Sequence, residues 1–98
     1  MYVVVATWVA REGQEQEIER ILRTISAATE ANEPGCLEFT VYRSNSDARH
    51  YMLYERYDDE QAFQAHRETE HFKTHVLGDA VANDRLEQRF AKFFEQLG

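Results

Sequence analysis

The chain has 98 residues, enough for one domain around one small hydrophobic core, and we expect residues 1–98 to form a single domain. Hydrophobic residues make up 43% and charged residues 30% of the sequence, and no apolar run approaches the ~20 residues of a membrane span. The formal net charge of -7 argues against a nucleic-acid partner, because phosphates attract clustered Lys and Arg. Since Cys36 is the only cysteine and the N-terminus lacks the basic leader of a secretory signal, we expect a cytoplasmic protein.

The first third of the chain changes from a strand pattern to a helix pattern. Residues 2–10 are rich in β-branched and aromatic side chains, which predicts a strand that is apolar on both faces. Residues 14–32 predict an amphipathic helix with the apolar stripe Ile18, Ile21, Leu22 and Ile25. Pro34 should end this helix, because a proline disfavours the helical conformation at the preceding residue, Glu33.

The middle of the chain, residues 36–57, predicts a β-hairpin. The segments "CLEFTVYR" and "HYMLYERY" alternate as strands do and flank the turn residues "SNSDAR". In the first of these strands, simple alternation places Leu37, Phe39 and Val41 on one face.

The rest of the chain predicts two short helices and an ambiguous end. Asp58 or Asp59 can cap a helix over "DEQAFQAHRE", and Thr69 can cap a second helix after a break at residues 67–69. The buried stripe of the second helix would be Phe72, Val76 and Ala80. At the C-terminus, Leu86, Phe90, Phe93, Phe94 and Leu97 match a helical stripe, so periodicity alone predicts a helix there.

Three segments, "EPGCLEFTVYRS", "YMLYERYDDEQAFQAH" and "TEHFKTHV", resemble the antibiotic biosynthesis monooxygenase family. The resemblance implies an α+β, ferredoxin-like βαββαβ fold with a four-stranded antiparallel sheet, which pairs with a second copy as a dimeric α/β barrel. It also implies that residues 87–95 form the fourth strand, against the periodicity. A homodimer agrees with strands that are apolar on both faces, since one layer of helices covers only one face.

The family includes cofactor-independent oxygenases of small phenols or quinols, haem-degrading enzymes and an isomerase of phosphorylated autoinducer-2. The pattern H-x-x-T-x-H-[FYM]-K, which begins at His66, is similar to that of the quinol oxygenases and the isomerase. Haem-degrading members typically have Trp in place of His66 and Asn in place of Ala6 or Thr7, so the resemblance implies no haem.

The stretch "HRETEHFKTH" contains the main candidates for acid/base chemistry. His66 and His71 could transfer protons near neutral pH, and Glu55, a charged residue in an apolar strand, could fix the tautomer of one of them. Alternatively, the histidines cap helices and Glu55 pairs with an arginine. We expect no metal, because a zinc site needs at least three protein ligands and no third ligand is visible beside His71 and His75.

Aromatic side chains could line a substrate pocket between the sheet and the helices, although aromatics in a small domain are usually core. The candidates are Trp8, Phe39, Tyr54, Phe63 and Phe72.

The resemblance implies a cofactor-independent monooxygenase that acts on a small phenol or quinol, and the candidate residues suggest histidine-assisted deprotonation. Its partners would be a small-molecule substrate, molecular oxygen and a second copy of the chain. No glycine-rich loop for a nucleotide or a phosphate is visible, so we expect no cofactor. The alternatives are an isomerase of a small hydroxyketone, of the phosphorylated autoinducer-2 type, and a dimer that binds a small molecule without turnover.

Overall fold

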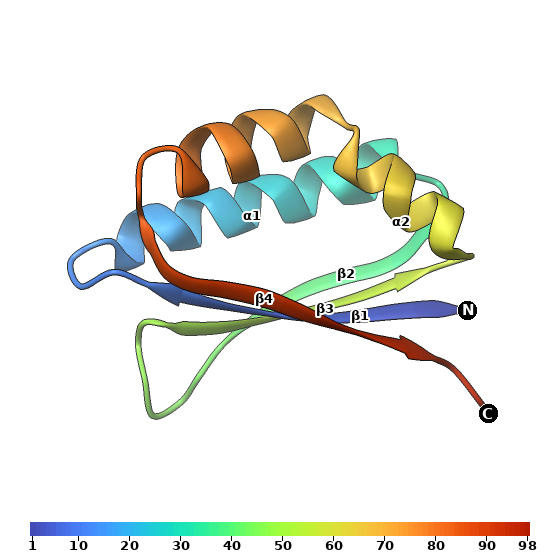
Figure 1. Ribbon diagram of the computed structural model, residues 1–98, viewed down its shortest axis with the longest axis horizontal. Coiled ribbons are helices and arrows are strands. Elements are labelled where there is room, and N and C mark those ends of the chain that lie inside the picture. Colours follow the sequence, from blue (N-terminus) through green and yellow to red (C-terminus); the bar gives the residue numbers. More distant parts are fainter.

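The computed structural model describes residues 1–98 as an α+β domain with one sheet and one layer of helices (Figure 1). Its elements are β1 (Tyr2–Ala10), α1 (Glu15–Asn32), β2 (Cys36–Arg43), β3 (His50–Tyr57), α2 (Glu60–Arg67), η1 (Phe72–Val81) and β4 (Leu86–Glu95). The strands form one antiparallel sheet in the order β2-β3-β1-β4, which is the ferredoxin-like topology and confirms the expected fold class. None of the helices is both long enough and apolar enough to cross a membrane.

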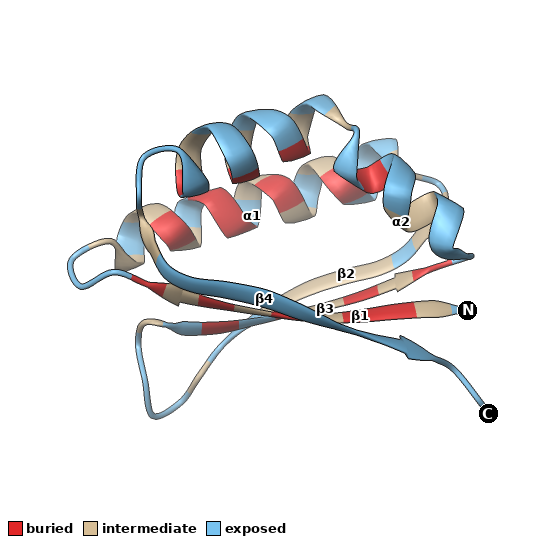
Figure 2. Ribbon diagram, viewed as in Figure 1, coloured by how far each residue is buried: buried red, intermediate tan, exposed pale blue.

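The core lies between the sheet and α1. The α1 stripe that helical spacing predicts, Ile18, Ile21, Leu22 and Ile25, is buried. Figure 2 shows buried segments recurring along α1, above the sheet. From β1, Ala6, Trp8 and Ala10 pack against this stripe, and Tyr51 and Leu53 do so from β3. The opposite face of the sheet carries no helix (Figure 1), although it also bears apolar side chains.

The second helical region is divided into two segments, as the sequence predicts. Asp59 caps α2 by accepting a hydrogen bond from the backbone N–H of Ala62 at 2.9 Å. Thr69 stabilises the break from both sides: its hydroxyl donates to the carbonyl of His66 at 2.8 Å and accepts from the N–H of Phe72 at 3.2 Å. The second segment, η1, is a π-helix whose residues Phe72, Val76 and Ala80 are buried, which is the predicted stripe.

The C-terminal segment is a strand, so the helix predicted from its periodicity is wrong and the strand implied by the family resemblance is confirmed. β4 pairs with β1 from Tyr2↔Glu95 to Ala10↔Leu86. Its phenylalanines do not form a buried stripe: Phe90, Phe93 and Phe94 are all exposed. Backbone pairing with a strand more than 70 positions away therefore overrides the local pattern.

The start of β2 also departs from simple alternation. The pairing of β2 with β3 shifts between Cys36↔Tyr57 and Glu38↔Arg56, so Leu37 is an extra residue without an opposite partner. Consequently, Cys36 lies on the helix-facing side with Tyr57, and Leu37 is exposed rather than grouped with Phe39 as predicted.

Candidate active site

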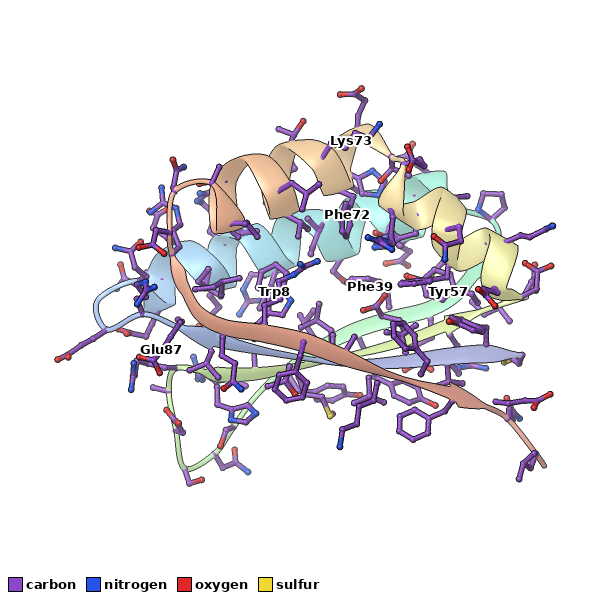
Figure 3. All side chains as sticks on the ribbon, in the orientation of Figure 1. Trp8, Phe39, Tyr57, Phe72, Lys73 and Glu87 are labelled. Atoms are coloured by element: carbon purple, nitrogen blue, oxygen red, sulfur yellow. The ribbon has the colours of Figure 1, made fainter.

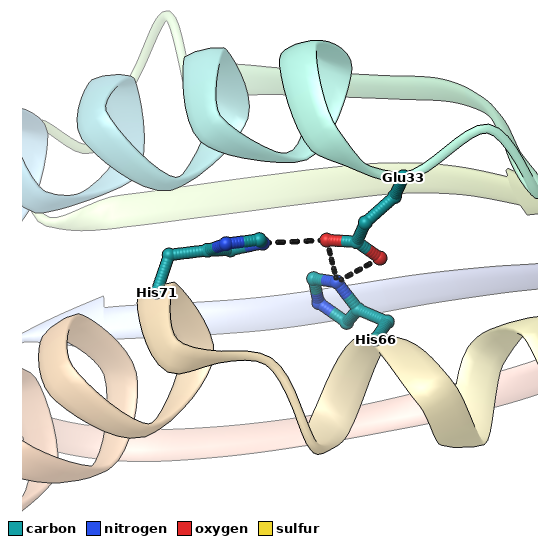
Figure 4. Close-up of side chains that lie close together, drawn as sticks. All are labelled: Glu33, His66 and His71. Carbon is teal, nitrogen blue, oxygen red and sulfur yellow. Dashed lines mark hydrogen bonds and ion pairs between the residues drawn. The ribbon is translucent and has the colours of Figure 1, made fainter.

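Three side chains from separate segments meet at the end of α1: Glu33, His66 and His71 (Figure 4). Both carboxylate oxygens of Glu33 lie 3.0 Å from Nδ1 of His66, and one of them lies 2.5 Å from Nε2 of His71. The side chains of Glu33, His66 and His71 are only 10%, 4% and 12% exposed, so the cluster is largely removed from water. The histidines of the "HRETEHFKTH" stretch are thus brought together through a glutamate that lies more than 30 residues earlier in the chain.

The local sequence explains why Glu33 points toward α2. Glu33 follows the last residue of α1 and precedes Pro34, and its φ of -121° and ψ of 88° are extended rather than helical. Gly35 allows the chain to pass close to α2, because a β-carbon at that position would lie 3.0 Å from the Cβ of Ala62. The "EPG" turn therefore directs the carboxylate toward His66.

The hydrogen bonds of Glu33 define which nitrogen of each histidine carries a proton. Burial raises the pKa of Glu33, but the hydrogen bonds and charges of His66 and His71 outweigh burial, so the net pKa is lowered and the group is a carboxylate at neutral pH. A carboxylate only accepts hydrogen bonds, so Nδ1 of His66 and Nε2 of His71 must both donate. In its neutral form, His66 then has a free lone pair on Nε2, which makes it a proton acceptor.

A cavity of about 240 Å³ lies next to His66, between the sheet and the helices. Because 12 of its 16 lining residues are hydrophobic, the His66 ring lies in largely apolar surroundings. The ring centroid of His66 is 5.5 Å from that of Phe39 and 5.3 Å from that of Phe72. Figure 3 shows Trp8, Phe39 and Phe72 in the layer between sheet and helices, where this cavity lies.

Glu55 is a second buried acid at the cavity wall. It is 5% exposed, and it accepts a hydrogen bond of 2.6 Å from the hydroxyl of Tyr57. Burial raises its pKa from 4.5 to about 7, although the Tyr57 hydrogen bond and the charges of His66 and Arg89 act in the opposite direction. The carboxyl group can therefore be a hydrogen-bond donor or a carboxylate near neutral pH.

Most of the residues that the sequence suggests for the pocket lie at the cavity. Trp8, Phe39, Phe63, Phe72, Glu55 and His66 line it. Tyr54 does not, because it pairs with Val5 and both point to the opposite face of the sheet. His71 lies outside the cavity, in a shallow surface site with Thr69 and His75.

Glu33 is the residue that the sequence analysis missed. The role of orienting a histidine was given to Glu55, but the structure shows no hydrogen bond between Glu55 and either histidine, and Glu33 bonds to both. The available signal was the position of Glu33, an acid directly before a helix-ending proline, where its direction is fixed by the turn.

Glu33 is also a possible third metal ligand beside His66 and His71. The expectation of no metal rested on the absence of such a ligand. The ligand atoms of Glu33, His66 and His71 all lie within 4.8 Å of one another, so they could hold one metal ion, and two histidines with one carboxylate is a set that binds iron in some oxygenases. Two ligands of a tetrahedral ion lie roughly 3.3 Å apart, however, given metal distances near 2.0–2.1 Å. The separation of 2.5 Å between Glu33 and His71 fits a hydrogen bond better than two ligands of one ion.

The model of the antibiotic biosynthesis monooxygenase family matches residues 1–76, which include the whole of this cluster. The chain belongs to this family. A comparison with curated proteins gave no match.

Several solved structures are similar to the chain over nearly its whole length. A Nitrosomonas europaea protein, provisionally named an antibiotic biosynthesis monooxygenase, is 26% identical, with a TM-score of 0.91 and 100% of both chains covered. A Caulobacter crescentus protein with the same provisional name is 27% identical, with a TM-score of 0.86 over 99% of this chain and 90% of its own. Protein PA3566 of Pseudomonas aeruginosa is 25% identical, with a TM-score of 0.87 over 99% and 94% of the two chains. Family membership thus supports a general monooxygenase-type function and does not name a substrate.

Proposed function

We propose that the protein is a cofactor-independent monooxygenase of a small phenol or quinol, with His66 as the base that removes the hydroxyl proton of the substrate. The observation that supports this role is the orientation of the His66 ring. Nδ1 is fixed by Glu33 at 3.0 Å, and no hydrogen-bond partner is present at Nε2, in a residue that lines the cavity. The base and the space for a substrate are thus adjacent.

The proposed reaction needs no electron donor other than the substrate itself. Nε2 of His66 takes the hydroxyl proton, and the resulting anion adds molecular oxygen at a ring carbon. His66 returns the proton to the peroxide, and loss of water, which carries away the hydrogen of that carbon, gives a quinone. One oxygen atom enters the product and the other leaves as water, so the phenol provides four electrons and no external reductant is needed.

Within this proposal, Glu33 and His71 act through His66. The carboxylate of Glu33 holds the ring in one tautomer and stabilises the imidazolium that forms when His66 accepts a proton. His71 donates to the same carboxylate from the outer side of the cluster, next to a site at the surface.

The test is a panel of phenols, quinols and small hydroxyketones, with oxygen uptake and isomerisation followed in parallel. We expect oxygen uptake with at least one phenol or quinol and a loss of about a hundredfold or more in turnover for His66→Ala. His75→Ala is the matched control, because His75 lies in the same region but outside the cavity, and it should lose little. Isomerisation without oxygen uptake would establish the alternative reaction, and full activity of His66→Ala would refute the role of His66.

We also propose that two copies pair through the uncovered face of the sheet. Large apolar side chains on that face are exposed in the single chain: Tyr42, Met52, Phe90 and Phe94. An interface of this kind would bury more than ~2,000 Å² in total, as stable dimers do. Analytical ultracentrifugation at micromolar concentration should show a dimer, and a stable monomer would contradict the pairing.

A further inference from the structure

Two arginines at the cavity, Arg67 and Arg89, lack an acidic partner within the protein. Both line the cavity, and neither guanidinium group takes part in a hydrogen bond or a salt bridge. Every other arginine forms a salt bridge with a carboxylate at 3.5 Å or less. Of the 11 Lys and Arg side chains, the three without an acidic partner are thus Arg67 and Arg89, beside the cavity, and Lys92, and all three residues are exposed in the single chain.

Arg89 is held in place by aromatic rings rather than by an acid. It pairs with Trp8 across β1 and β4, and its guanidinium carbon lies 5.9 Å from the Trp8 ring centroid and 5.8 Å from that of Phe72. Such cation–π contacts orient the group but leave its five N–H donors free for other acceptors.

Arg67 and Arg89 line the same cavity, so their like charges act on each other. Desolvation, and then the charge of Arg67, lower the pKa of Arg89, while the carboxyl of Glu55 acts in the opposite direction. Glu55 does not neutralise Arg89, since its hydrogen bond is with Tyr57 and the structure shows no salt bridge to it. An anion bound between the two guanidinium groups would relieve this repulsion.

We propose that the substrate of this site carries an anionic oxygen group, a carboxylate or a phosphate monoester, which Arg67 and Arg89 bind together. The proposal rests on the function proposed above and adds the chemical class of the substrate. A planar guanidinium matches a carboxylate or a phosphate with two parallel hydrogen bonds, which makes arginine well suited to both. The apolar part of the substrate would then lie against Trp8 and Phe72, with its acidic proton directed to His66.

The size of the cavity limits the apolar part to about one ring. A cavity of about 150 Å³ holds a benzene molecule. The 240 Å³ found here therefore accommodates a single substituted ring, with its charged substituent at the arginines.

The test measures binding without turnover, by calorimetry of the full chain with three matched probes: 4-hydroxybenzoate, 4-hydroxyphenyl phosphate and the neutral 4-hydroxybenzamide. At least one of the two anions should bind tenfold more tightly than the amide. A preference for 4-hydroxybenzoate would identify a carboxylate substrate, and a preference for 4-hydroxyphenyl phosphate would identify a phosphate monoester. Equal affinity for all three probes, or no binding of either anion, would overturn the proposal.

Variants of the arginines show whether the preference arises at this site. Arg89→Gln and Arg67→Gln should each weaken anion binding about tenfold or more, with an unchanged melting temperature as the control for folding. Arg89→Lys keeps the charge and should retain part of the affinity. Arg23→Gln is the matched control, because Arg23 is 76% exposed on α1 and forms only a surface salt bridge, so anion affinity should not change. Full anion affinity in both Arg67→Gln and Arg89→Gln would refute the assignment.

The His66→Ala variant tests the anion site independently of the proposed catalytic role of His66. It should retain the preference for anions, because His66 is not one of the two guanidinium groups. If no probe or substrate is oxidised but the arginine variants lose anion binding, the anion site stands without the monooxygenase. If quinols are oxidised and the anions bind no better than the amide, the anion site alone is refuted.

Discussion

Glu55 should make the protein less stable as the pH rises, and Glu55→Gln should remove this effect. The carboxyl is 5% exposed, and burial raises its pKa from 4.5 to about 7. Below pH 4.5 the group is protonated in both the folded and the unfolded chain. Above that pH the unfolded chain loses the proton first, so the stability from the raised pKa is lost progressively until the pH passes about 7.

The size of the effect follows from the shift in pKa. Each unit corresponds to about 1.4 kcal/mol, so Glu55 should lower the free energy of unfolding by about 3 kcal/mol between pH 4.5 and pH 8. Glutamine cannot ionise, and its side-chain oxygen can still accept the hydrogen bond from Tyr57. The variant should therefore lack this part of the pH dependence while keeping the shape of the site.

The assay is urea unfolding of both proteins at pH 4.5 and pH 8, at one protein concentration. With an m-value of roughly 1.5 kcal/mol/M, the midpoint of wild type should fall by about 2 M more than that of Glu55→Gln. Taking the difference between the two proteins cancels other titrating groups, including Glu33, whose lowered pKa acts with the opposite sign. Glu30→Gln, an exposed acid on α1, should behave as wild type. If wild type and Glu55→Gln have the same pH dependence, the buried carboxyl does not titrate as the structure indicates.

Glu33→Gln should lower turnover at least tenfold, because the amide no longer stabilises the His66 imidazolium, and the pH profile of kcat/KM should shift with it. Elemental analysis of the purified protein by mass spectrometry should find less than one equivalent of iron or zinc. One equivalent of metal in wild type that is lost in His71→Ala would instead establish a metal site at the cluster. Ile21→Ala should cost about 3 kcal/mol in urea unfolding, since Ile21 is fully buried against the sheet, and a cost below about 1 kcal/mol would contradict that packing. Anion affinity should increase as the pH falls through about 7, because protonation of Glu55 removes a negative charge near the arginines, and this pH dependence should be absent in Glu55→Gln.

Sequence periodicity correctly predicts those elements whose buried face follows from the spacing of apolar residues within the element itself. Helix α1 has one apolar stripe and ends at a proline, so both its buried face and its end were correct. The fourth strand could not be predicted in this way, because the pattern of its phenylalanines is helical and its strand geometry comes from pairing with β1. Only the family resemblance identified that segment as a strand.

Residue spacing along the chain predicts which side of a strand a side chain faces, but it does not predict contacts between distant segments. Glu55 and Tyr54 are neighbours in one strand, so they must face opposite sides, and placing both at one pocket was inconsistent with strand geometry. The error was therefore avoidable from the sequence. By contrast, the contact between Glu33 and the two histidines joins residues 33 and 38 positions apart, and no local pattern encodes such a distance.

The groups that support the proposed base are distinct from the side chains that line the cavity. His66 lines the cavity, while Glu33 bonds to its ring, His71 bonds to Glu33, and neither of these two lines the cavity. Mutations of Trp8 or of the arginines can thus change which molecule is bound without disturbing the support of the proposed base. This modularity gives a physical route by which chains of one fold could diversify their substrates and keep a common proton-transfer unit.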